Sequence, residues 1–336
     1  TAPLQALSKY DAGAMAAGDT VDGITIVLKR DDDREKAFRS YLSALNNPAS
    51  PDFHHWLTAK ELGERFGPAP QDVQAVQQWL RSQGMTVSSV SGDRMRIVVS
   101  GSATAVGKAF GTELHRYDVD GGRHFANATA TKVPVALSPV IQAVALDDFF
   151  PKAQHTPVAR ATFDRKHGKW STDAAARPDF TVPPGNTNPN TTYDMVPADF
   201  NQVYNVKPLW QRRDALRGAG QTVVVLERTN VLPDDVARFR RAFLPADAKG
   251  TFSILHPINE GEACADPGRN GDEGEAALDA EWAGAAAPDA DVVLASCADY
   301  GASFGPFTAA ARLLEGGPNG ELPPPVWSLS YGACES

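Results

Sequence analysis

A stretch rich in proline, asparagine and threonine divides the chain of 336 residues and limits what it can fold into. Proline recurs through residues 151–192, and neither helical nor strand periodicity appears there. Segments of this kind lie exposed and are readily cut by proteases. We therefore expect an exposed linker with a processing site at 151–192, between one domain at 1–150 and another at 193–336. A plain interdomain tether would explain the same composition.

The first domain mixes short helices with short strands. A helix opens at Ala69-Pro70, carries apolar residues at helical spacing and ends at Gly84. The other expected elements are a helix at 104–110 and strands at 24–28, 85–90, 95–99 and 113–117. Two helices packed on a small antiparallel sheet predict an α+β, ferredoxin-like fold.

The second domain alternates between apolar strands and helices. The expected strands are 221–226, 252–255, 292–295 and 326–330, and the expected helices are 232–243 and 273–286. This alternation predicts an α/β fold with a mostly parallel sheet that is covered on both faces. Only four residues follow Gly332, so we expect the sheet to be incomplete in this chain.

Charge and hydropathy exclude several classes of partner. The formal net charge is −9 and basic residues are scattered, which argues against nucleic acid or an anionic membrane surface as the partner. No apolar stretch approaches the roughly 18 residues that a membrane helix needs. The first residue is Thr1 rather than methionine, which fits either a recombinant start or a chain already trimmed by signal peptidase; on the second interpretation we expect export. An acidic surface also tolerates an acidic medium.

Three cysteines lie in the last quarter of the chain, at Cys264, Cys297 and Cys334. Their spacing and neighbours do not match a metal site. In an oxidising compartment, Cys264 and Cys297 would close a loop of roughly 33 residues and stabilise the fold by about 3 to 4 kcal/mol. Cys334 would then lack a partner. Three ordinary buried thiols in a cytosolic protein are the alternative.

Two acidic residues stand four apart on the helix expected at 273–286. Glu275 and Asp279 therefore lie on one helical face and can project into a single cleft. Two such carboxyl groups tend to share a proton and can supply an acid and a base at a pH where histidine is protonated. The alternative is a solvated acidic face, because Asp272, Glu273 and Glu281 crowd the same helix.

The residues around this pair resemble a known family. Gly274-Glu275-Ala276-Ala277-Leu278-Asp279 and the following Ala-Gly-rich stretch are similar to the catalytic helix of the sedolisin (serine-carboxyl peptidase) family. Further motifs follow the family's order along the chain. They are Trp56-Leu57-Thr58 and Glu64–Pro68 of a pro-kumamolisin-type activation domain, the start at Pro197–Val206, the strand after Gly220 and the Ser328–Gly332 segment.

The resemblance implies roles for residues of the second domain. Glu275 would be the general base that takes a proton from a serine, and Asp279 would orient it. Glu227 would belong to an additional acid network behind the pair; the alternative is a surface glutamate paired with Arg228. Tyr331 falls where relatives place a tryptophan, and its alternative is plain core packing.

The resemblance also implies parts that residues 1–336 do not contain. Ser328, Ser330 and Gly332 would form the strand that pairs with the substrate backbone in a subtilisin-like fold. The family's G-T-S motif with the nucleophilic serine, and its calcium site, are both expected after this strand. We therefore expect no metal site and no catalysis in this chain alone, and a second chain or segment that supplies the serine and a partner for Cys334.

Together these features predict the zymogen of a secreted peptidase that hydrolyses proteins or peptides in acid and is cleaved autocatalytically. Its prodomain would act as folding chaperone and inhibitor, with a linker that crosses the cleft and is released as acid titrates interface carboxylates. The alternative is an inactive, non-enzymatic binding scaffold.

A third interpretation fails on residue order. The Ser328-x-Ser330-x-Gly332 pattern also resembles a degraded nucleophile elbow of an α/β hydrolase. Such enzymes place their histidine after the serine, whereas the last histidine in this chain is His256.

Overall fold

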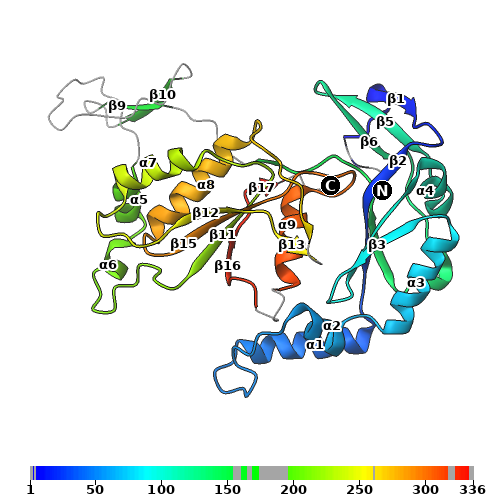
Figure 1. The fold of residues 1–336 in the computed structure, drawn as a ribbon, viewed down its shortest axis with the longest axis horizontal. Helices are drawn as coiled ribbons and strands as arrows, with labels where there is room; N and C mark the ends of the chain where they lie inside the picture. Colours follow the sequence, from blue (N-terminus) through cyan, green and yellow to red (C-terminus); the bar gives the residue numbers. More distant parts are fainter. Residues whose placement is uncertain are drawn as a thin grey trace.

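A computed structural model describes residues 3, 5–153, 160–164, 169–173, 196–259, 262–316 and 322–332; of 160–164, 169–173, 259, 262 and 263 it describes the backbone alone. Figure 1 shows two units, one N-terminal (blue to green) and one C-terminal (green to red). Both combine helices with sheets, as the sequence predicts. No helix in the described part of the chain is long and apolar enough to span a membrane.

The N-terminal unit is built on a four-stranded antiparallel sheet in the order β3-β4-β2-β7. Its elements are β2 (Thr20–Leu28), α3 (Pro70–Ser82), β3 (Thr86–Val90), β4 (Arg96–Ser102), α4 (Ala103–Phe110), η2 (Val135–Leu137) and β7 (Ile141–Ala145). Alternate residues of β2, among them Ile24 and Ile26, are fully buried against Leu80 of α3 and Phe110 of α4. The two helices thus cover one face of the sheet, as predicted.

The strand expected at 113–117 does not join this sheet. It forms the middle of a separate three-stranded sheet in the order β1-β5-β6, made of β1 (Asp11–Ala14), β5 (Leu114–Val119) and β6 (Gly122–Asn127) after the short helix η1 (Ser8–Tyr10). Leu114 and Phe125 still contribute to the main core, because the two sheets share it.

A helical hairpin was not predicted. It consists of α1 (Asp32–Leu45) and α2 (Ala59–Phe66) and projects from the N-terminal unit (Figure 1). Its helices pack through a separate small cluster of Tyr41, Leu45 and Phe66. A capping box between Thr58 and Glu61 fixes the start of α2.

The segment expected to lack regular structure contains two short antiparallel strands, β9 (Arg160–Asp164) and β10 (Lys169–Asp173). The rest of 154–195 lies outside the described residues, as do Cys334 and the chain end after Gly332.

The C-terminal unit contains the predicted parallel sheet, in the order β12-β15-β11-β16. Its elements are α5 (Pro197–Val203), α6 (Lys207–Trp210), β11 (Thr222–Glu227), α7 (Pro233–Phe243), β12 (Phe252–Leu255), β13 (Ile258–Asn259), β14 (Glu262–Ala263), α8 (Glu273–Ala286), β15 (Asp291–Ser296), α9 (Gly305–Leu314), β16 (Val326–Ser328) and β17 (Tyr331–Gly332). Helices α7 and α8 cover one face through Val236 and Ala280, and α9 covers the other through Ala309.

A disulfide joins Cys264 to Cys297, whose Cα atoms lie 5.5 Å apart. Both cysteines are buried between the sheet and α9. The bond ties the residue after β14 to the residue after β15, and it therefore holds the loop that follows β15 at the carboxyl edge of the parallel sheet.

Candidate active site

The predicted acidic residues meet at the carboxyl edge of the parallel sheet. Glu227 is the last residue of β11, a central strand, and its side chain is fully buried. The run of valines before it explains why the strand lies inside the sheet. Ligands of open parallel sheets bind at this edge.

Helix α8 places the carboxylate pair beside this edge. Glu275 lies in its first turn, 4% exposed, and Asp279 is half-buried one turn later. The neighbouring stripe of small residues, Ala276 and Ala280, packs on the sheet and fixes which way the helix faces. The interpretation of Glu275 as part of a solvated acidic face is therefore wrong.

The end of β16 and the residues just after it supply two hydroxyl groups to Asp279. Ser330 donates a hydrogen bond to Asp279 Oδ2 over 2.6 Å, and Ser328 donates to the same atom over 3.2 Å. The sequence suggested only a backbone role for these serines. Their side chains also hold one oxygen of Asp279 in place.

Glu227 interacts with Tyr331 rather than with Arg228. The Tyr331 hydroxyl donates to Glu227 Oε2 over 2.7 Å, and Glu227 Oε1 is buried with no hydrogen-bond partner among the described residues. Burial raises the pKa of Glu227 to about 8, the Tyr331 hydrogen bond opposes this, and the charges of Asp279 and Glu275 add to it. Glu227 is therefore a neutral acid at and below neutral pH.

Arg228 forms a second network at the mouth of the site. Its guanidinium lies 3.6 Å from Asp272 and also pairs with Asp299. Burial raises the pKa of Asp299 although Arg228 opposes the shift. The alternative, in which Glu227 is a surface glutamate paired with Arg228, is thus wrong, and no sequence signal pointed to Asp299.

The start of the linker lies on the strand predicted to bind substrate. Strand β8 (Lys152–Ala153) pairs antiparallel with β17, with Ala153 opposite Tyr331 and Lys152 opposite Gly332. Two residues that follow the N-terminal unit therefore occupy the backbone positions next to Ser330. Nothing in the composition of 151–153 indicated this pairing.

A serine, a histidine and an aspartate also meet nearby, but their geometry does not suit hydrolysis. Ser296 is fully buried and donates its hydroxyl hydrogen to Asn230 Oδ1 over 2.6 Å. His256 Nδ1 lies 2.9 Å from the Ser296 carbonyl oxygen, so this nitrogen carries the hydrogen and does not act as a base toward the hydroxyl. Asp266 lies 3.7 Å from the other ring nitrogen. The cluster is structural.

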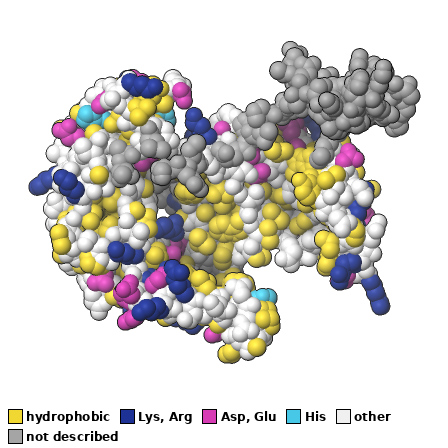
Figure 2. Space-filling view, turned by 180° about the vertical axis from the view of Figure 1, so that it is seen from behind, with side chains coloured by type: hydrophobic (Ala, Val, Ile, Leu, Met, Phe, Trp, Pro, Cys, Tyr) yellow, Lys and Arg dark blue, Asp and Glu magenta, His cyan; other side chains and the backbone are white. Residues whose placement is uncertain are grey.

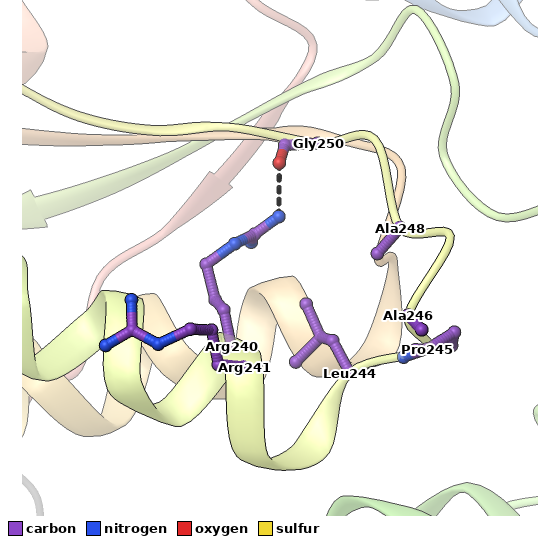
Figure 3. A pocket seen from close by; sticks show the side chains of 7 residues that line it. All are labelled: Arg240, Arg241, Leu244, Pro245, Ala246, Ala248 and Gly250. Atoms are coloured by element: carbon purple, nitrogen blue, oxygen red, sulfur yellow. Dashed lines mark hydrogen bonds between the residues drawn. The ribbon is translucent and has the colours of Figure 1, made fainter.

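A surface hollow lies at the opposite end of the sheet (Figure 3). It is lined by Arg240, Arg241, Leu244, Pro245, Ala246, Ala248 and Gly250. Arg240 is engaged by the Gly250 carbonyl oxygen, to which it donates. Because Gly250 precedes β12, the hollow faces the amino ends of the strands and is remote from the carboxylates.

Metal-binding geometry is absent from the described part of the chain, where no group of three or more His, Cys, Asp or Glu side chains is placed to hold an ion. The acidic residues of the site are instead engaged by hydroxyl groups and by Arg228.

Comparisons with known proteins match both units. Residues 9–149 match the family described as "Pro-kumamolisin, activation domain". Kumamolisin of Bacillus sp. (strain MN-32) is 27% identical over 302 residues, which are 89% of this chain and 49% of kumamolisin. Sedolisin of Pseudomonas sp. (strain 101) is 32% identical over 143 residues, 43% of this chain and 24% of sedolisin. Xanthomonalisin of Xanthomonas sp. (strain T-22) is 33% identical over 108 residues, 32% of this chain and 13% of xanthomonalisin.

The chain thus spans about half the length of kumamolisin. An alignment over 302 residues does not fit within the N-terminal unit, so the likeness extends into the unit that contains α8. The activation-domain match ends at residue 149, just before the linker. Residues 9–149 thus match a pro-kumamolisin activation domain, and the chain is similar to precursors of the sedolisin family.

Proposed function

We propose that this chain is the N-terminal part of a secreted, acid-acting peptidase zymogen that hydrolyses peptide bonds through a Ser-Glu-Asp site. The observation that carries the proposal is the position of Asp279, which two serine hydroxyls hold one helical turn from the buried Glu275. The serine itself is proposed to come from polypeptide outside residues 1–336, because the G-T-S motif does not occur within them.

The proposed roles of Glu275 and Asp279 follow from their different surroundings in the site. Glu275 would accept the proton of the attacking serine and return it to the leaving amine. Asp279 would orient Glu275 and share a proton with it, so that charge is relayed within the pair. A carboxylate base remains usable at pH 4, where a histidine is protonated. Glu227, neutral under these conditions, adds no further negative charge behind the pair.

Exposed apolar side chains on the C-terminal unit support the proposal that a further segment of polypeptide completes the site. Strand β16 lies at the edge of the sheet as described, and Val326 and Leu329 are 46% and 39% exposed. Leu278, on α8 between the two catalytic candidates, is 44% exposed. Figure 2 shows hydrophobic side chains gathered in the middle of the face seen from behind. A second chain or segment carrying the serine, calcium and a partner for Cys334 would cover such groups.

The domains are proposed to be an activation prodomain at 1–150, a linker with the maturation site at 151–192 and the peptidase part at 193–336. A strand order of β3-β4-β2-β7 with two covering helices supports a ferredoxin-like prodomain. The parallel sheet with helices on both faces supports a subtilisin-like peptidase part.

The pairing of β8 with β17 supports inhibition by the prodomain, since a substrate backbone would need the same edge. The proposed release by acid finds less support. Burial raises the pKa of Glu315, which accepts the Gly92 backbone N–H over 2.8 Å across the two units. Burial favours the neutral form of Glu315, so acid does not by itself drive the two units apart there, although the hydrogen bond from Gly92 favours the ionised form.

The test uses the full-length protein, including the polypeptide after Ser336. We expect it to hydrolyse unfolded casein at pH 4 and to lose at least roughly a thousandfold in rate with Glu275→Ala. Glu273→Ala, on the same helix, serves as the matched control and should remain near the wild-type rate. Full activity of Glu275→Ala would overturn the proposal, and an inactive wild type would favour the binding scaffold.

A further inference from the structure

Two neighbouring phenylalanines at the end of the prodomain contact different units. The Phe149 ring stacks on His124 with centroids 4.6 Å apart and lies 6.1 Å from Tyr117, both in the N-terminal unit. The Phe150 ring lies 5.3 Å from the ring of Phe304, in the C-terminal unit. Neighbouring side chains of an extended chain point to opposite sides, which suits this division. Phe150 is thus an aromatic side chain that the prodomain places on the peptidase part.

The surface that receives Phe150 is aromatic and adjoins the acid network. Phe304, which caps the start of α9, is 3% exposed. Its ring makes an edge contact with Tyr331 at 5.2 Å, and the Arg228 guanidinium lies 5.8 Å from its centroid. Tilted and edge contacts with a cation over the ring favour an aromatic occupant beyond what apolar area alone provides.

The backbone register fixes where this surface lies along a bound peptide. Lys152 pairs with Gly332, so Phe150 is two residues before the residue opposite Gly332. A substrate that pairs with β17 in the same direction places its own residue at that position over Phe304.

We propose that Phe304, Tyr331 and Arg228 form a subsite that selects an aromatic side chain of the peptide substrate, two residues before the residue opposite Gly332. Phe150 fills this subsite in the zymogen. The inference rests on the proposed peptidase function and adds a sequence preference to it.

The experiment uses the activated full-length enzyme and peptides that copy residues 147–158 with Phe, Leu or Ala at position 150. Burying one aromatic ring against another predicts a kcat/KM for the Phe peptide roughly tenfold above that for the Ala peptide. Phe304→Ala should reduce this ratio to within about twofold. Phe307→Ala is the matched control, because Phe307 lies 5.2 Å from Phe304 and is 53% exposed; it should leave the ratio unchanged.

Casein hydrolysis separates this inference from the proposed function. A wild type that degrades casein but cleaves the Phe and Ala peptides equally well would overturn the subsite alone. If the wild type degrades no substrate, the function fails, and calorimetric binding of the same peptides decides the subsite: tighter binding of the Phe peptide supports it and equal binding overturns it. Should Phe304→Ala not fold, the peptide series on the wild type gives the decision.

Discussion

Tyr331 donates a hydrogen bond to Glu227 over 2.7 Å and so connects the strand that holds the linker to the end of the central strand β11. The acceptor is fully buried, and burial raises its pKa to about 8. A buried acid of this kind is stable in its neutral form, which agrees with the proposed action in acid.

The stability of the protein should therefore depend on the ionisation of Glu227. The pKa of Glu227 rises from 4.5 to about 8 on folding. Its contribution to the free energy of unfolding is therefore fully present below pH 4.5 and is lost as the pH rises through 8. Glu227→Gln should remove on the order of 4 kcal/mol from the fall in unfolding free energy between pH 4.5 and 9. Denaturant melts measure this, with the exposed Glu64→Gln as control. An unchanged pH slope in Glu227→Gln would contradict the assignment.

The two serines before Tyr331 should differ in their effect on activity. Ser330→Ala removes the 2.6 Å hydrogen bond to Asp279, and Ser328→Ala removes the 3.2 Å one. Hydrogen bonds to a charged group contribute about 1.5 to 3 kcal/mol, so Ser330→Ala should lower kcat/KM roughly tenfold or more and Ser328→Ala less. A larger loss of kcat/KM with Ser328→Ala than with Ser330→Ala would show that the Ser328 hydrogen bond to Asp279 is the stronger of the two.

A variant of Glu315 tests whether docking of the two units is favoured by the neutral or by the ionised form of this carboxyl group. Its pKa is raised chiefly by burial, so its contribution to docking is present at low pH and is lost as the pH rises. Glu315→Gln, which stays neutral, should slow activation of the full-length protein at pH 7 by a few-fold and leave it unchanged at pH 4. The exposed Glu64→Gln controls for charge. Faster activation of Glu315→Gln at pH 7 would mean that the ionised carboxylate holds the units together.

The disulfide between Cys264 and Cys297 should stabilise the peptidase part. It closes a loop with a sequence separation of 33, for which the chain-entropy model gives about 3 to 4 kcal/mol. The double variant Cys264→Ala/Cys297→Ala should therefore melt several degrees lower than the wild type. Equal melting temperatures would indicate that the bond is not formed in the protein.

Local sequence patterns predicted many elements of the C-terminal unit. The helix α8 begins and ends where expected, at Glu273 and Ala286, because alanine and small residues recur along it. The strand β12 also agrees with its expected range, since a short apolar run is bounded by polar residues. These elements depend mainly on neighbouring residues in the chain.

Elements that depend on distant partners were missed. Helix α1 is rich in charged residues, and only Tyr41 and Leu45 are buried, so its apolar periodicity is weak. The pairing of β8 with β17 joins residues about 180 apart in the sequence, and two residues carry no strand pattern. For the same reason, the hydrogen bonds of Ser328 and Ser330 to Asp279 follow from the fold and not from any motif.

The carboxylate pair is best tested by a double-mutant cycle in the activated full-length enzyme, with kcat/KM measured at pH 4 for Glu275→Gln, Asp279→Asn and the double variant. Because the two carboxyl groups are proposed to act as one unit, each single change should cost at least roughly a thousandfold, and the double variant should lie within a few-fold of the worse single variant. Losses that multiply, or a single variant with near wild-type activity, would contradict the account.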